Sequence, residues 1–205
     1  MSSEPCPYVS RGGLKLQAAL DAFGVDVTGS CCADLGCNAG GFTDCLLQRG
    51  ATRVFAVDTG YGALAWKLRQ DPRVAVMERT NALHVDTSKL EGFEPCAFVV
   101  IDLGWTRQNK AIPAALAWLD KTNPAARIIT LIKPHYEADT QTLSRGRKGG
   151  ILTDDDARVV AQRVIDELPA LGVKVLGGIE SPLRGGAGKG KAGNIEFLAL
   201  LERAG

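Results

Sequence analysis

The segment Asp34–Thr43, with the sequence DLGCNAGGFT, places a glycine-rich turn between an apolar run and the start of a helix. A second apolar run, Val54–Val57, is followed directly by Asp58. Glycines at such a turn let backbone N–H groups approach a ligand closely, and a carboxylate after the next strand can accept hydrogen bonds from a ribose diol. Together the two segments predict a binding site for an adenosine-containing cofactor.

Strand-like and helix-like segments alternate along the whole chain. Strands are expected near 31–36, 53–58, 73–78, 97–102, 126–132, 173–180 and 194–201, and helices near 13–23, 41–49, 62–70, 107–121 and 154–171. This alternation predicts an α/β fold with a seven-stranded, mostly parallel sheet that carries helices on both faces. The last strand follows its predecessor through a loop, so it should run antiparallel. Residues 1–7 are expected to form a tail, and residues 8–205 a single domain.

Length and composition restrict the class of protein. The chain has 205 residues, of which 45% are hydrophobic, and a formal net charge of +1. A packed core is therefore expected, and any contact with nucleic acid must come from local basic patches. No apolar run approaches the roughly 20 residues that span a bilayer, and the first residues lack a secretory signal pattern, so we expect a cytoplasmic protein without membrane attachment. The cysteines and histidines lack the spacing of zinc ligands, so no metal site is expected.

Two apolar runs end in a charged residue. Asp102 follows one such run, and Lys133 follows another. A charge at the edge of an apolar strand must be solvated, paired or used in function. If the two strands are neighbours, the carboxylate and the ammonium lie side by side, and Glu196 in the last strand and Lys15 on the first helix would complete a ring of alternating charge. Ion pairs at the sheet edge and a catalytic role both agree with this pattern.

The order Lys15, Asp102, Lys133 and Glu196 resembles the Lys-Asp-Lys-Glu tetrad of FtsJ-type RNA ribose 2′-O-methyltransferases, most closely their hemolysin-like (TlyA) branch. Six phrases in the same order carry the resemblance: YVSRGGLKL (8–16), GGFT (40–43), VDTGYG (57–62), MERTN (77–81), LIKP (131–134) and GNIEF (193–197). The resemblance implies a Rossmann-like class I methyltransferase fold. It also implies that the cofactor is S-adenosylmethionine and that the methyl acceptor is RNA, with ribosomal RNA expected.

The resemblance also implies roles for individual residues. By position, the residues implied to bind the cofactor are Gly36, Gly40, Gly41, Phe42, Thr43, Asp58, Asn81 and Asp102. Among them, Asp58 would hold the ribose hydroxyls and Asn81 would lie near the adenine. Lys133 is implied to activate the target 2′-hydroxyl, with Lys15, Asp102 and Glu196 orienting it. Two roles stay open for Lys133, because a neutral lysine would accept the proton and a charged one would stabilise the developing alkoxide.

The basis of RNA binding is less direct. Relatives of the hemolysin-like branch carry an S4-type RNA-binding domain ahead of the phrase that begins at Tyr8, and this chain is expected to lack it. RNA would then contact two basic, glycine-containing loops, unless these are merely solvated. The candidate residues are Arg145, Arg147 and Lys148 in the first loop, and Arg184, Lys189 and Lys191 in the second. Trp105, after Asp102, would either stack on a substrate base or pack at the strand end.

Three other functions were compared with this hypothesis. A nucleotide-hydrolysing P-loop is excluded, because Ala192 stands where the motif needs Ser or Thr and a strand follows instead of a helix. A Rossmann oxidoreductase would need G-x-G-x-x-G, which the residues Cys37–Ala39 interrupt. A non-catalytic RNA-binding or hemolysin-like protein could keep the fold as a scaffold. Retention of all four tetrad residues argues against that scaffold, as does the lack of a visible amphipathic insertion segment.

Overall fold

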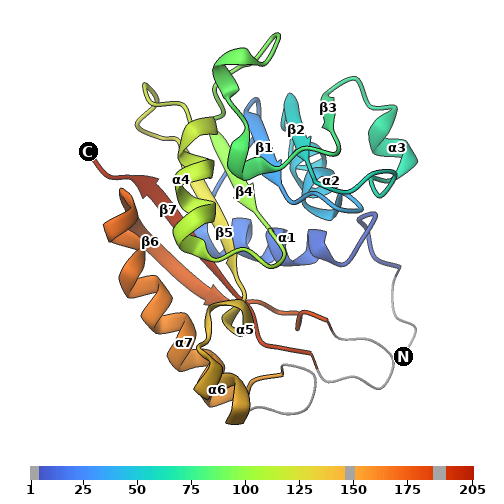
Figure 1. Cartoon of the computed structure of the whole chain (residues 1–205). Coiled ribbons are helices and arrows are strands. Elements are labelled where there is room, and N and C mark those ends of the chain that lie inside the picture. The colour runs from blue at the N-terminus through green and yellow to red at the C-terminus, as the bar shows by residue number, and fades with distance from the viewer. Residues whose placement is uncertain (1–4, 146–150, 187–192) are drawn as a thin grey trace.

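A central sheet with helices on both faces forms the molecule (Figure 1). A computed structural model describes residues 5–145, 151–186 and 193–205 of the chain. Within these ranges the sheet has seven strands: β1 Cys31–Leu35, β2 Arg53–Val57, β3 Val74–Met77, β4 Phe98–Ile101, β5 Arg127–Ile132, β6 Val173–Glu180 and β7 Phe197–Arg203. The helices are α1 Gly12–Phe23, α2 Gly41–Gln48, α3 Trp66–Arg69, α4 Gln108–Trp118, α5 Pro134–Glu137, α6 Thr140–Arg145 and α7 Asp154–Glu167. Short 3₁₀ helices lie at 82–84, 87–89 and 168–171.

The strand order is β3-β2-β1-β4-β5-β7-β6. The first five strands pair in parallel, and β7 runs antiparallel between β5 and β6, which confirms the predicted fold class. Parallel strands place their carboxyl ends at one edge of the sheet, where ligands bind in folds of this type. Since β7 runs antiparallel, its beginning lies at that same edge. Ile132 of β5 pairs with Phe197 of β7. Lys133, which follows Ile132, and Glu196, which precedes Phe197, are therefore next to each other at the edge of the sheet.

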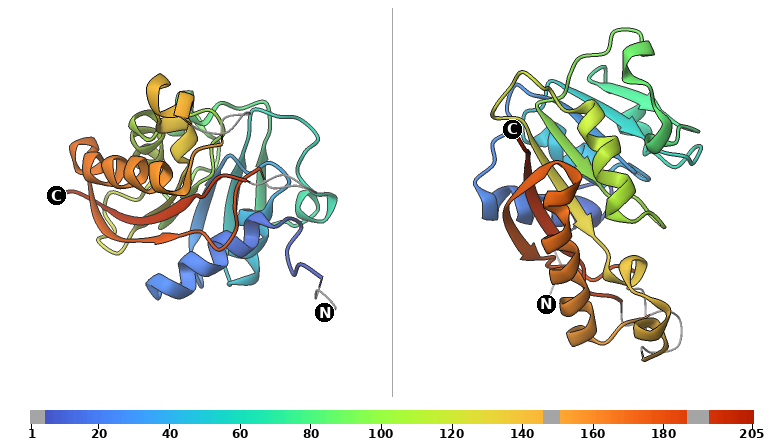
Figure 2. Two further views of the ribbon diagram at one scale, coloured as in Figure 1. Left: turned by 90° about the horizontal axis from the view of Figure 1, so that it is seen from below. Right: turned by 60° about the vertical axis from the view of Figure 1, so that its left-hand side comes forward.

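Two hydrophobic layers enclose the sheet. One face is covered by α4 and α7, through buried residues that include Ala111, Ile112, Trp118, Val160 and Val164. The other face is covered by α1, α2 and the region of α3, through Leu16, Leu20, Leu46, Leu64 and Leu68. Figure 2 shows α1 and α7 on opposite sides of the strands. The interior strands are buried on both faces and mostly apolar, as expected for a covered parallel sheet.

Several element boundaries differ from the expectations. The helix expected at 62–70 is only α3, because Gly62 is left-handed (φ +74°) and Ala65 is extended. The helix expected at 154–171 turns into a 3₁₀ segment at Leu168, where Pro169 lacks the N–H that the α-helix needs. The last strand begins at Phe197, so Glu196 precedes it instead of lying inside it. The short helices α5 and α6 had no sequence signal.

Over the described ranges, no helix is both long and apolar enough to cross a membrane. The same residues contain no group of three or more His, Cys, Asp or Glu side chains placed to hold a metal ion.

Candidate active site

The ends of β4 and β5 bring the first two charged residues together. Asp102 follows β4 and Lys133 follows β5, and the two strands are neighbours in the sheet. The Lys133 Nζ lies 2.6 Å from Asp102 Oδ1 and also donates to the Leu103 carbonyl at 3.3 Å. Both side chains are mostly shielded from solvent, so the ammonium is held in one place by a short ion pair.

A second ion pair forms beside the first. Lys15 projects from the beginning of α1, and its Nζ lies 2.5 Å from Glu196 Oε2. Glu196 is only 3% exposed. Burial raises the pKa of Glu196, whereas the ammonium groups of Lys15 and Lys133 oppose that rise. The backbone of Gly185 packs so closely on this carboxylate that a Cβ there would overlap it.

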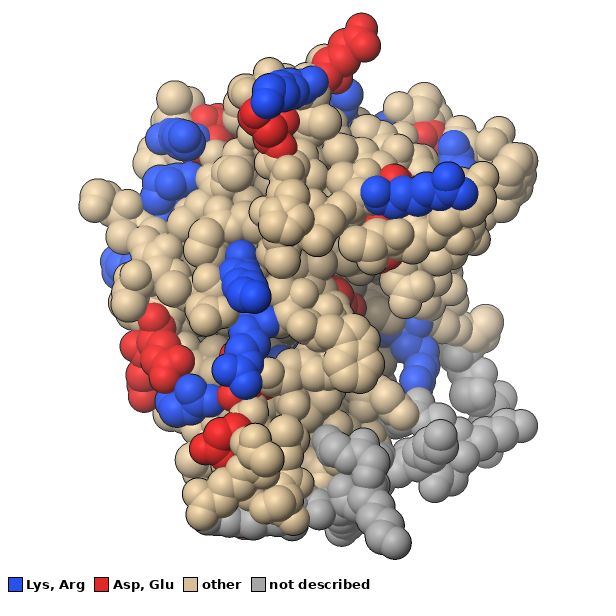
Figure 3. All heavy atoms as spheres, viewed as in Figure 1, with Lys and Arg blue, Asp and Glu red and all other residues tan. Residues whose placement is uncertain are grey.

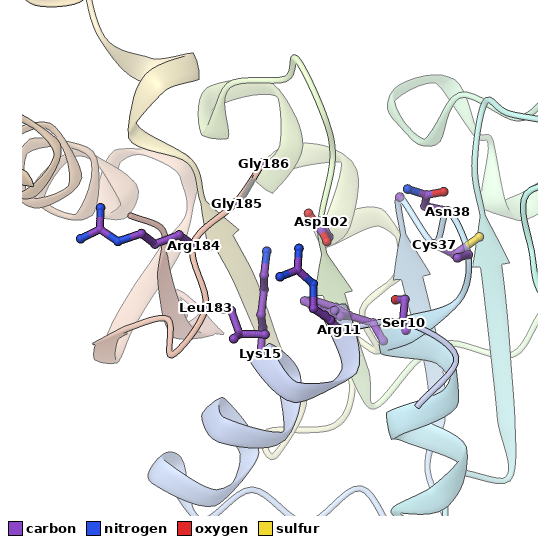
Figure 4. Close-up of a pocket in the computed structure, with 15 residues that line it drawn as sticks. Ser10, Arg11, Lys15, Cys37, Asn38, Asp102, Leu183, Arg184, Gly185 and Gly186 are labelled. Carbon is purple, nitrogen blue, oxygen red and sulfur yellow. The ribbon is translucent and has the colours of Figure 1, made fainter. Parts of the chain in front are cut away.

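All four charged residues line one cavity of about 1360 Å³ at the carboxyl edge of the sheet. A smaller adjoining cavity of about 260 Å³ shares Lys15, Gly36 and Asp102 with it. Figure 4 shows Arg11 and Lys15 extending side by side from the beginning of α1 in the direction of Asp102. The structure thus brings the predicted tetrad residues together and places them beside the glycine-rich turn.

The glycine-rich turn and Asp58 form the other end of the larger cavity. Gly36 is left-handed (φ +96°), and a Cβ there would lie 2.6 Å from the Asp102 carbonyl oxygen. Asp58 accepts the amide of Asn38 at 2.8 Å through one oxygen and the amide of Gly60 at 2.7 Å through the other. Each carboxylate oxygen keeps a lone pair, so both can accept a further hydrogen bond from a vicinal diol. These residues fit the ribose of an adenosine cofactor.

The remaining predicted cofactor residues divide into two groups. Asn81 lines the larger cavity and accepts the Leu83 amide, while Gly41 and Phe42 line the smaller one. Gly40 lies against Leu64 and Leu68, which a Cβ would overlap, and Thr43 is fully buried. Gly40 and Thr43 therefore lie behind the turn and support its shape.

Thr43 holds a buried carboxylate to which the sequence assigned no role. Asp34, in β1, accepts both the amide and the hydroxyl of Thr43, at 2.9 and 2.7 Å, through one oxygen. Its other oxygen is buried without a hydrogen-bond partner among the described residues. Burial raises the pKa of Asp34 to about 7, with smaller contributions from the charges of Asp102 and Asp58. The only sequence signal was an acid inside an apolar run.

The pKa of Asp34 predicts a specific dependence of stability on pH. Between about pH 4 and pH 7 the unfolded chain ionises Asp34 while the folded protein keeps it protonated, so the free energy of unfolding falls as pH rises through this window. The rise from 3.8 to about 7 corresponds to a change on the order of 4 kcal/mol. Asp34→Asn should remove this contribution, measured by urea unfolding of both proteins across the window. Parallel curves for the two proteins would contradict it.

Aromatic residues lie where the cavity opens near Lys133. Trp105 is 88% exposed, adopts a left-handed conformation (φ +57°), and its ring centroid lies 4.9 Å from that of Tyr136. His135 also lines the cavity, and burial followed by the nearby Lys133 charge lowers its pKa to about 4. The imidazole is therefore neutral at pH 7. The sequence raised both roles for Trp105 but assigned none to His135 or Tyr136.

The predicted RNA-contacting residues are only partly described. Arg184 makes a two-pronged ion pair with Asp154, at 2.8 and 2.6 Å, and its side chain points away from Lys15 (Figure 4). Arg145 ends α6, and its side chain lies outside the described part of the structure, as do the whole residues Arg147, Lys148, Lys189 and Lys191. The contact of these residues with RNA therefore stays a prediction.

Comparisons with known proteins agree with this geometry. The model of the family "FtsJ-like methyltransferase" matches residues 8–198. "Putative rRNA methyltransferase YqxC" of Bacillus subtilis is 40% identical over 98% of this chain and 68% of that protein. "16S/23S rRNA (cytidine-2'-O)-methyltransferase TlyA" of Mycobacterium tuberculosis is 38% identical over 95% of this chain and 68% of its own length.

Among solved structures, "Putative hemolysin from Streptococcus thermophilus" matches with a TM-score of 0.88 and 36% identity. The match covers 99% of this chain and 70% of that one. The sequence match, the fold and the Gly36–Asp58 site lead to the same assignment. The chain belongs to the FtsJ-like methyltransferase family, and its cofactor is S-adenosylmethionine.

Proposed function

We propose that this chain transfers a methyl group from S-adenosylmethionine to a ribose 2′-hydroxyl of ribosomal RNA. The observation that carries the proposal is the pair of contacts Lys133–Asp102 and Lys15–Glu196, which line the same cavity as Asp58. The names of the relatives from Bacillus subtilis and Mycobacterium tuberculosis refer to rRNA, and the second also to the cytidine 2′-oxygen.

The end of the cavity that is lined by Gly36 and Asp58 binds the cofactor and orients it. Asp58 holds the ribose diol, while Gly36, which lines the same cavity, lets the turn pack closely against the Asp102 backbone. When bound, S-adenosylmethionine supplies an electrophilic methyl group on a sulfonium. Because displacement at this carbon requires the attacking and leaving atoms to be nearly in line, the fixed positions of these residues contribute much of the rate.

The other end of the cavity, around Lys133, binds the target hydroxyl and either accepts its proton or stabilises the charge that develops on its oxygen. Asp102 and the Leu103 carbonyl fix the position of the Lys133 Nζ, and the second ion pair fixes Glu196 beside it. In one role a neutral Lys133 takes the hydroxyl proton as the oxygen attacks. In the other role a charged Lys133 stabilises the developing negative charge on that oxygen. Both roles require the Nζ within hydrogen-bonding distance of the 2′-oxygen.

An RNA acceptor is supported by the aromatic opening of the cavity. The Trp105 and Tyr136 rings lie beside Lys133, and His135 is neutral there. The exposed indole, tilted by 33° against the Tyr136 ring, offers a flat surface for the base of a nucleotide whose sugar reaches Lys133. Each base–aromatic stack contributes about 1–3 kcal/mol.

The proposal is tested by methyl incorporation. The purified protein is incubated with methyl-labelled S-adenosylmethionine and with intact ribosomes, dissociated subunits or protein-free ribosomal RNA, and ribose methylation is mapped. We expect label at a 2′-oxygen of at least one of these substrates. Binding of the cofactor without label in any of them would refute methylation of ribosomal RNA and favour a non-catalytic role.

The cofactor site gives a separate prediction. Asp58→Ala should raise the Kd for S-adenosylmethionine about 10²- to 10⁴-fold, because it removes two hydrogen bonds to a charged group, each of which contributes about 1.5–3 kcal/mol. Asp26→Ala is the control, since this exposed acid precedes β1 at the opposite edge of the sheet. The measurement is isothermal titration calorimetry. An unchanged Kd for Asp58→Ala would exclude the carboxylate from the ribose site.

A further inference from the structure

Two large aromatic side chains between β2 and β3 are exposed. Tyr61 is 72% exposed and Trp66, the first residue of α3, is 73% exposed. Neither belongs to the hydrophobic layers of the fold. We refer to these two residues, together with Lys67 and Arg79, as the α3 flank. Exposed aromatic groups next to cations are typical of binding surfaces, since burial in the core does not explain them.

Arg79 is held over one of these rings. Its guanidinium carbon lies 4.1 Å from the centroid of Tyr61, a cation–π arrangement. No carboxylate within the described ranges forms an ion pair with it. The backbone of Arg79 is left-handed (φ +51°), a conformation that costs about 1–2 kcal/mol for a residue with a Cβ. The surrounding turn therefore maintains the exposed cation at a cost in stability.

Two carboxylates next to the α3 flank, Glu78 and Asp44, are shielded, whereas Lys67 and Arg79 are exposed. Glu78 is mostly buried, accepts the Gly62 amide and pairs with Arg69. Asp44 is 5% exposed, whereas its partner Lys67 is 57% exposed. Figure 3 shows Lys and Arg side chains on the surface at the right of the view, with smaller areas of Asp and Glu beside them, on the side of the molecule that carries β3 and α3. Arg79 over Tyr61 therefore presents a positive charge on an aromatic ring, and the Arg69–Glu78 ion pair joins α3, which carries the exposed Trp66, to the residue before Arg79. Cations and exposed rings of this kind complement a polyanion with exposed bases.

Backbone hydrogen bonds join the α3 flank to the cofactor site. The Arg79 amide donates to the Gly60 carbonyl at 3.0 Å, and the Thr80 amide donates to the Asp58 carbonyl at 2.9 Å. Gly60 and Thr80 both line the larger cavity. In the sheet, β2 is separated from β5 by β1 and β4, so the flank and Lys133 lie toward different ends of that cavity.

We propose that the α3 flank is a second contact surface for the RNA substrate. An unpaired base stacks on Trp66, and a phosphate binds Arg79, which Tyr61 holds in place. The inference rests on the proposed function and extends it to a site far from the transferred methyl group. Base stacking and phosphate contacts are the sequence-tolerant interactions by which proteins hold single-stranded RNA, and an aromatic–cation surface supplies both.

The test measures RNA binding and methylation separately. Trp66→Ala, Arg79→Ala and Tyr61→Ala are compared with wild type, using protein-free ribosomal RNA in filter binding at several salt concentrations and ribosomal subunits in methylation. Trp66→Ala should weaken RNA binding and raise KM about tenfold, with kcat within about twofold. Arg79→Ala should reduce the slope of log affinity against log salt by about one. The Kd for S-adenosylmethionine should not change.

Matched controls come from the same chain. Val159→Ala removes an exposed apolar group on α7, and Lys121→Ala removes an exposed cation after α4; neither should alter RNA binding. Wild-type affinity for protein-free RNA in both Trp66→Ala and Arg79→Ala would overturn the inference. A loss of methylation that occurs only with subunits containing ribosomal proteins, while the variants bind protein-free RNA normally, would also overturn the inference and would indicate a contact with protein. If the variants bind RNA more weakly but the wild-type protein methylates no substrate, the α3 flank remains an RNA-binding surface and the proposed reaction is refuted.

Discussion

Lys133→Ala is expected to lower the rate of methyl transfer about 10²- to 10⁴-fold while leaving the Kd for S-adenosylmethionine nearly unchanged. The substitution removes the only ammonium that contacts Asp102 within the described residues, at 2.6 Å, and with it the group placed to act on the 2′-hydroxyl. Asp102 is itself one of the implied cofactor residues. In the described part of the structure, however, the ribose-binding Asp58 and the turn at Gly36 make no hydrogen bond or ion pair with Lys133, so most of the cofactor affinity should persist. Single-turnover methylation and calorimetric titration measure the two effects separately.

A conservative variant distinguishes the two roles of Lys133. Lys133→Arg keeps a positive charge but cannot accept a proton near neutral pH. Partial activity of this variant would favour stabilisation of the alkoxide, and activity as low as that of Lys133→Ala would favour proton transfer. Lys121→Ala, which removes an exposed cation, is the control. Nearly full turnover by Lys133→Ala would remove Lys133 from the reaction.

Gly36→Ala is expected to abolish detectable cofactor binding and to lower the free energy of unfolding by about 3 kcal/mol. Two costs add up at this position. A left-handed residue with a Cβ costs about 1–2 kcal/mol, and forced overlap with packed atoms costs about 1–3 kcal/mol. The overlap is with backbone, because the added methyl would lie 2.6 Å from the Asp102 carbonyl oxygen. Relief of the clash would therefore displace the strand end that carries Asp102.

A second glycine separates the two costs. Gly29 is also left-handed (φ +74°), but nothing lies within 4 Å of the position of its Cβ. Gly29→Ala should therefore show only the conformational cost and keep full cofactor affinity. Urea unfolding and calorimetric titration of both variants provide the comparison. Equal losses of stability in the two variants, with cofactor binding retained in both, would show that the close approach of Gly36 to Asp102 is unimportant.

The general position of the site could be predicted from the sequence because it depends on local patterns. Apolar runs followed by Asp58, Asp102 and Lys133 mark the carboxyl ends of strands, and alternation of strands and helices makes those strands parallel. Parallel strands bring their ends to one edge, so the proximity of Asp102 and Lys133 followed from chain order. The 2.6 Å ion pair confirms that proximity.

The roles of the residues around the turn could not be separated from the sequence. Gly40 and Gly41 are adjacent and chemically identical, yet one packs against leucines and the other lines the smaller cavity. Thr43 was grouped with the cofactor residues, but its hydroxyl is directed at Asp34. A motif specifies which residue types lie at a turn, while the direction in which each one faces depends on the helices packed behind it.

The sequence alone determined the fold class, the glycine-rich turn and the charged strand ends, because each of these is set by a few neighbouring residues. Only the tertiary structure decided that Glu196 pairs with Lys15, which lies 181 residues earlier, that Asp34 is buried enough for its pKa to reach about 7, and that Arg79 stands over Tyr61. Burial, electrostatic environment and side-chain direction arise when distant segments pack together, and no local pattern encodes them.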